Sequence, residues 1–76
     1  MNINIKDILK LSDGYRYVVV SKANYQNKEY LYLVNINNSN NIKFCYINND
    51  ELIESENKGL NTMLLPLFYR NTKAAL

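Results

Sequence analysis

The sequence lacks most of the side chains on which enzyme catalysis depends. Histidine is absent, and Cys45 is the only cysteine among the 76 residues. Without histidine the chain cannot form a Ser-His or Cys-His nucleophile pair, and a zinc site of the usual Cys/His kind is excluded as well. Cys45 is flanked by aromatic residues of a predicted strand, where a buried, unreactive thiol is expected. We therefore expect a non-enzymatic protein with no catalytic residue, no cofactor and no metal ion.

A group of four carboxylates is the nearest approach to a catalytic or metal-binding cluster. It consists of Asp50, Glu51, Glu54 and Glu56. If residues 51–56 are extended, Glu54 and Glu56 lie on one face of a strand. Such a pair could bind a divalent ion or serve as acid and base, but a solvated acidic edge that discourages aggregation is the commoner role. We favour the acidic edge strand.

Aromatic side chains are better candidates for function, and they indicate binding. Tyrosine offers a large contact area and a hydroxyl group at little entropic cost, which suits a protein interface. The candidate partner-binding residues are Tyr15, Tyr25, Tyr30, Tyr32, Phe68 and Tyr69. We predict a small protein-interaction domain that acts through an apolar, tyrosine-rich surface on a protein partner of unknown identity.

Single-stranded nucleic acid is the alternative partner. Small barrels often bind single strands by stacking bases on aromatic rings beside a basic groove. Lys22, Lys28 and Lys43 are the candidate residues for such a groove. The formal net charge is only +2, whereas contacts of many Lys and Arg residues with phosphate supply most of the affinity for nucleic acid. We therefore rank nucleic-acid binding behind protein binding.

The elements that must position these residues are strands. Apolar and aromatic residues alternate with period two over 15–20, 30–36 and 42–47. Residues 3–11 add a first strand that is interrupted, and residues 51–55 add a short, charged edge strand. Asp13-Gly14 predicts a type I′ turn with positive φ, Asn27-Lys28 predicts a second turn, and residues 48–50 a third. The asparagines between 37 and 41 are expected to form a loop rather than a ligand site.

Five short antiparallel strands with two apolar faces should not remain flat. We therefore expect a mainly β protein, in which a small five-stranded antiparallel barrel or curled sheet encloses one face. Tyr17, Val19, Leu31 and Leu33 are the candidate inward residues, although a shift of one residue in register would exchange the two faces. The opposite face must be covered by residues 60–69 or by a second subunit.

Residues 57–70 are predicted to form a short helical segment after the β region of residues 1–56. Its apolar stripe consists of Leu60, Met63, Leu64, Leu67 and Phe68. Pro66 removes one backbone hydrogen bond, so either a kinked helix or two short helical turns are expected. Asn61 or Thr62 is the predicted N-cap. Residues 71–76 carry no packing pattern and are predicted to be a frayed tail of the single domain 1–76.

Two motifs carry a resemblance to a known group of proteins. They are the hairpin with Asp13, Gly14, Tyr17, Val19 and Val20, and the strand from Tyr30 to Leu33. Over about residues 5–55 the chain resembles small SH3-like β-barrel proteins of unknown function from low-GC Gram-positive bacteria and their mobile elements. The resemblance implies an SH3-like barrel and assigns no functional residue. The Trp and Pro cluster of peptide-binding SH3 domains is missing, since the chain has no Trp and one Pro.

Length and composition add three expectations. A single small core supplies only about 3–5 kcal/mol of net stability, so a chain without disulfides or a Cys/His metal site favours a homodimer. The N-terminal residues lack the apolar run of a signal peptide and nothing approaches a membrane span, so a cytoplasmic protein that does not contact membranes is expected. Asn, Ile, Lys and Tyr make up 35 of the 76 residues, which is typical of an A/T-rich genome and agrees with a phage- or plasmid-encoded accessory or inhibitor protein.

Overall fold

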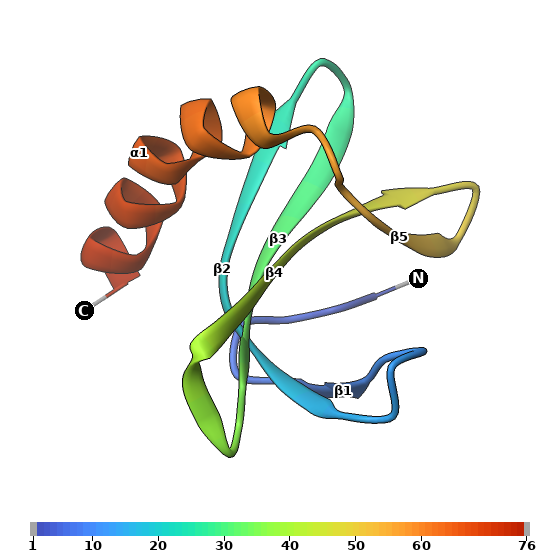
Figure 1. Ribbon diagram of the computed structural model, residues 1–76. Helices are drawn as coiled ribbons and strands as arrows, with labels where there is room; N and C mark the ends of the chain where they lie inside the picture. The colour runs from blue at the N-terminus through green and yellow to red at the C-terminus, as the bar shows by residue number, and fades with distance from the viewer. Residues whose placement is uncertain (1, 76) are drawn as a thin grey trace.

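The protein is a curled antiparallel sheet with one C-terminal helix. The structure, a computed structural model, describes residues 2–75. In chain order the elements are β1 (Ile8–Lys10), β2 (Arg16–Tyr25), β3 (Lys28–Asn35), β4 (Asn38–Asn48), β5 (Glu51–Glu54) and α1 (Lys58–Ala75). The strands are hydrogen-bonded in that order and curl into a half-barrel (Figure 1). The predicted mainly β fold with five antiparallel strands and a C-terminal helix is confirmed.

The predicted first strand is shorter than its sequence pattern. The residues before β1 are not extended, because the Asp7 backbone N–H donates to the Asn4 carbonyl at 3.0 Å and the Asn4 N–H donates to Asp7 Oδ2 at 2.8 Å. This turn replaces the first half of the predicted strand. Ile3 is nevertheless buried in the inner core, while Ile5 is exposed.

The first turn differs in type from the prediction. Gly14 has the expected positive φ of 87°, but Asp13 is not among the residues with positive φ, so the turn is not type I′. The Gly14 N–H donates to the Leu11 carbonyl and the Leu11 N–H donates to the Tyr15 carbonyl, both at 3.0 Å. This pattern is a three-residue hairpin loop that ends in a left-handed glycine.

Two later turns have the type I′ geometry. Gln26 and Asn27 have φ values of 50° and 65°, so the predicted turn at Asn27-Lys28 lies one residue earlier than expected. Asn49 and Asp50, with 51° and 63°, form the turn before β5. Both residues of a type I′ turn need positive φ, which asparagine tolerates better than most residues.

The asparagine-rich connection is shorter than predicted. Asn35 pairs with Asn38, so only Ile36 and Asn37 form the turn and β4 begins within the predicted loop. The Asn37 N–H donates to the Asn35 side-chain oxygen at 2.8 Å. Asn41 donates to the Tyr17 hydroxyl at 3.1 Å, so one member of the cluster supports the hairpin between β1 and β2.

The concave face of the sheet holds the inner core. Tyr17, Val19, Leu31 and Leu33 are fully buried there, which confirms all four predicted inward residues. Ile3 and Cys45 complete the buried cluster, and Leu9, Leu11, Ile47 and Leu52 pack against it. The Tyr17 hydroxyl donates to Asp13 Oδ2 at 2.7 Å, which satisfies its polar end at the rim.

Helix α1 covers part of the convex face. It packs through a second cluster whose buried members are Ala23, Tyr30, Leu64 and Phe68. The predicted cover by residues 60–69 is therefore confirmed for this half of the sheet. In Figure 1, α1 lies beside the halves of β2 and β3 next to their shared turn, whereas β1 and the β3–β4 turn lie beyond its C-terminal end.

The helix differs from the prediction at both ends and at Pro66. It begins at Lys58, because Asn57 Oδ1 accepts the Leu60 N–H at 3.0 Å; the N-cap is therefore Asn57, and neither Asn61 nor Thr62. It runs without a break through Pro66, which is exposed, and continues past Arg70 to Ala75 into the predicted tail. Leu76 lies outside the described residues. Met63, predicted in the apolar stripe, is 48% exposed. Within residues 2–75 no helix is long and apolar enough to cross a membrane.

Candidate interaction surface

A row of aliphatic side chains crosses four strands on the convex face beyond the end of α1. Ile8 pairs with Val18, Val18 with Val34, and Val34 with Ile42. Directly paired residues project on the same side of a sheet. Val34 alternates with Leu33 and so shares the face of Tyr32, which packs against α1. We call Ile8, Val18, Val34 and Ile42 the apolar row.

No element of the described chain lies over the apolar row. Ile8 is 58% exposed and Ile42 is 38% exposed, while Val18 and Val34 are half-buried by their neighbours. Ile36, just after β3, is 44% exposed. Single exposed apolar residues are common on protein surfaces, but a contiguous set across several strands is typical of a binding surface.

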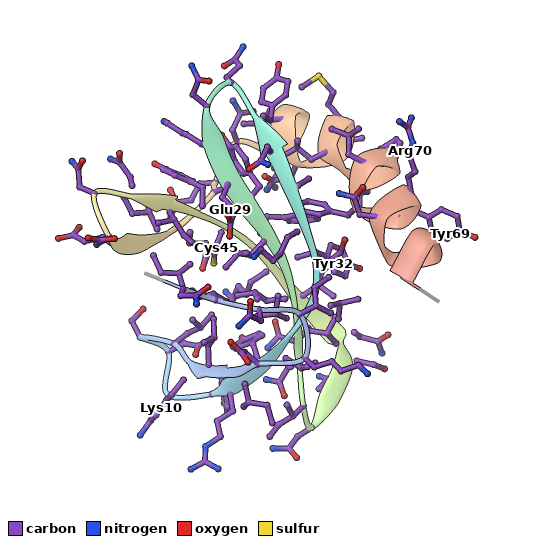
Figure 2. The ribbon with its side chains drawn as sticks, turned by 180° about the vertical axis from the view of Figure 1, so that it is seen from behind. Lys10, Glu29, Tyr32, Cys45, Tyr69 and Arg70 are labelled. Carbon is purple, nitrogen blue, oxygen red and sulfur yellow. The ribbon has the colours of Figure 1, made fainter. Side chains whose placement is uncertain are left out.

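An apolar hollow borders α1, and its strand residues Val20 and Tyr32 stand two positions from Val18 and Val34 of the row. It has a volume of about 250 Å³ and is lined by Val20, Tyr32, Leu65, Phe68 and Tyr69. Tyr69 is 71% exposed and points away from the sheet, whereas Tyr32 lies between β3 and the helix (Figure 2). The ring centroids of Tyr32 and Phe68 are 5.7 Å apart, so the floor of the hollow is fixed by aromatic packing.

The six predicted partner-binding residues fall into three places. Tyr32, Phe68 and Tyr69 meet at the hollow. Tyr25 and Tyr30 pack together near the β2–β3 turn, and Tyr15 is exposed just after the β1–β2 turn. Tyr30 and Phe68 are only 5% and 2% exposed. Both side chains fill the interface between α1 and the sheet, and Phe68 also lines the hollow.

The apolar row itself was not among the predicted site residues. Its members belong to the aliphatic alternation of the strands, which predicts a covered face. Cross-strand register decides which of these residues stand side by side, and register is not visible in one sequence.

The three lysines proposed for nucleic acid do not form one groove. Lys22 donates to the Ile3 carbonyl at 2.7 Å and lies 3.2 Å from Glu29, and Lys43 lies 3.2 Å from Glu54. Lys22 and Lys43 pair with Leu31 and Leu33 and so belong to the inner face, whereas Lys28 lies 4.8 Å above the ring of Tyr46 on the helix-bearing face. Each lysine already has a partner within the protein.

Only one member of the predicted acidic pair lies in β5. β5 ends at Glu54, which pairs with Lys43, while Glu56 lies in the segment before α1. Both carboxylates border a second hollow of about 550 Å³, whose lining also includes Lys28, Tyr30 and Tyr46. In residues 2–75 no three His, Cys, Asp or Glu side chains gather as a metal site requires. The mixed charges of this hollow do not indicate one class of ligand.

Cys45 lies in the inner core and not at a reactive site. The thiol is 2% exposed, and burial raises its pKa to about 11. A reactive cysteine needs an accessible thiolate, which an elevated pKa suppresses near neutral pH.

Comparisons of the chain with protein families, with curated proteins and with solved structures give no match. The choice of the apolar row and the adjacent hollow as the candidate interaction surface therefore depends on the geometry of the protein alone.

Proposed function

We propose that this protein is a non-enzymatic interaction domain that binds another protein through the apolar row and the adjacent hollow. The observation that supports this proposal is the continuity of the row across β1, β2, β3 and β4, with no element of residues 2–75 above it. The two buried apolar clusters of the described residues lie in the inner core and under α1, so neither is open to a partner. Burial of apolar surface contributes about 25 cal/mol per Å², so a partner that covers the row gains most of its affinity there.

The aromatic residues beside the row support the same proposal. Tyr69 and Tyr32 place rings at the edge of the hollow, and tyrosine is enriched among the residues that dominate binding energies. An accessory or inhibitory role encoded by a mobile element fits a small domain of this kind. Nucleic-acid binding has less support, because Lys22, Lys28 and Lys43 are engaged within the protein and lie on two faces.

Charge substitutions in the row test the proposal. We expect Ile8→Glu and Ile42→Glu to abolish capture of a specific protein partner, while circular dichroism shows an unchanged fold because both positions are exposed. Thr62→Glu is the matched control, since it adds the same charge at an exposed position on α1 away from the row. Capture of the same proteins by all four forms, or of nuclease-sensitive material only, would contradict the proposal.

A further inference from the structure

We propose that the occupant of the apolar row is an amphipathic α-helix of a partner protein that carries acidic side chains beside its apolar stripe. The inference rests on the proposed function and specifies the partner's shape and charge. Two features of the surface carry it, namely the spacing of the row and the distribution of charge around it.

The spacing of the row suits a helix that crosses the strands. Neighbouring strands lie about 4.8 Å apart, so a row of side chains across four strands extends over about 14 Å. A helix presents one side-chain layer every 5.4 Å and rises 1.5 Å per residue, so about ten residues of helix cover this span. α1 already packs on the same face through Leu64 and Phe68. A second helix beside it would also bury Leu65 and Tyr69 in the hollow.

The charged side chains that β1, β2 and α1 contribute beside the row are all basic, while Asp7 and Asp13 lie in the turns on either side of β1. β1, β2 and α1 contain no Asp or Glu, although the chain has seven acidic residues in total. Lys10 and Arg16 pair across β1 and β2 on the face of the row, and both are exposed. Arg70 adds a third exposed cation on α1, and Figure 2 shows Lys10 and Arg70 directed away from the protein at opposite ends. No ion pair occupies Lys10 or Arg16 among the described residues.

The same charge distribution argues for a foreign helix over a second copy. A closed two-fold dimer through the row would bring Lys10 and Arg16 of both copies into its rim. The acidic residues on either side of β1, Asp7 and Asp13, already accept hydrogen bonds from the Asn4 N–H and the Tyr17 hydroxyl. An acidic helix would instead neutralise Lys10 and Arg16 while it covers Val18 and Ile42. Complementary rim charges accelerate association and exclude wrong partners.

Selection from a displayed peptide library tests the inference on the full chain. Each peptide is a designed helix with a fixed leucine stripe, and every position beside the stripe is Glu, Gln or Lys. We expect Glu to be enriched. The affinity of a selected helix should fall by about tenfold or more in Lys10→Glu/Arg16→Glu, and it should fall with added salt. Repeating the selection on this double variant should enrich Lys instead.

Matched controls separate the charge from the apolar contact. Lys58→Glu makes one of the same charge reversals at the distant N-terminus of α1 and should leave affinity within about twofold. Ile42→Glu should abolish binding. Helices that require Ile42 but show no acidic preference would overturn this inference and leave the proposed function standing.

The remaining outcomes all count against an acidic helix. If no helix is selected and sedimentation shows a dimer that Ile42→Glu dissociates, the occupant is a second copy. If no helix is selected and the protein binds vesicles of phosphatidylserine and phosphatidylcholine, the occupant is a membrane surface. If nothing binds in any of these arms, both the inference and the proposed function are wrong.

Discussion

Replacing Leu64 with Ala tests whether α1 is held on the sheet by its buried face. Leu64 is fully buried in the cluster with Ala23, Tyr30 and Phe68. Leu→Ala substitutions in cores cost about 2–5 kcal/mol, and a fully enclosed site should fall near about 3 kcal/mol. Since a core of this size supplies about 3–5 kcal/mol of net stability, Leu64→Ala should leave the domain close to its unfolding midpoint.

The neighbouring residue provides the matched control. Leu65 is 39% exposed at the hollow, so Leu65→Ala should cost about 1 kcal/mol or less while it changes helix propensity equally. Urea unfolding in sodium sulfate, followed by circular dichroism and tyrosine fluorescence, measures both variants. If Leu64→Ala has no folded baseline, Leu64→Met should lose less than about 1.5 kcal/mol and remain measurable. Equal losses for Leu64→Ala and Leu65→Ala would refute the packing of α1 described above.

Three further predictions concern the turns, the rim and the core. Gly14→Ala should lower the free energy of unfolding by about 1 kcal/mol because of the positive φ at this position, and not because of a clash, since nothing lies within 4 Å of an added Cβ. Gly59→Ala, in the helix, should raise the free energy of unfolding by up to about 1 kcal/mol. The urea midpoints of the two variants should therefore move in opposite directions. Tyr17→Phe should raise the pKa of Asp13, because the Tyr17 hydroxyl is the main cause that lowers it, followed by the Tyr15 backbone N–H. Because the folded-state pKa of Asp13 is lowered, its ionised carboxylate stabilises the fold above the unfolded-state pKa, and this stabilisation is lost as pH falls through the folded-state pKa. The stability advantage of wild type over Tyr17→Phe should therefore shrink on acidification. A carboxyl titration by NMR that finds no change in the pKa of Asp13 would contradict this. Cys45 should react with a thiol reagent at neutral pH only at the rate of unfolding, and rapid labelling of the folded protein would exclude its burial.

The inward residues were predictable because their sequence pattern is strong. Tyr17 and Val19 alternate with residues of the other face, and so do Leu31 and Leu33, which is what a two-sided sheet requires. The turn between β2 and β3 lies one residue before its predicted position. Asparagine tolerates positive φ, but Gln26 adopts it as well, so the residue types alone do not give the position of the type I′ turn.

Continuity of the helix through Pro66 depends on tertiary packing that a sequence does not show. An interior proline costs about 3 kcal/mol, which favours an interrupted helix when only local energies are compared. Burying Leu64 and Phe68 returns about 1.5–3 kcal/mol for each side chain. Pro66 is exposed, so it faces solvent while both buried side chains keep their contacts with the sheet.

The feature that most limited prediction of the site is the irregularity at Val20. Val19 pairs with Leu33 and Ser21 with Tyr32, so Val20 is an extra residue that reverses the alternation of β2. If β2 alternated regularly through Val20, Lys22 would share the face of Val18 and would be placed under α1, where an unpaired charge is costly. With the irregularity, the small residues Ser21 and Ala23 lie under the helix, and Ser21 Oγ donates to the Phe68 carbonyl at 2.8 Å. Val18 stays on the same face but beyond the helix, so the irregularity that seats α1 also sets where the apolar row begins.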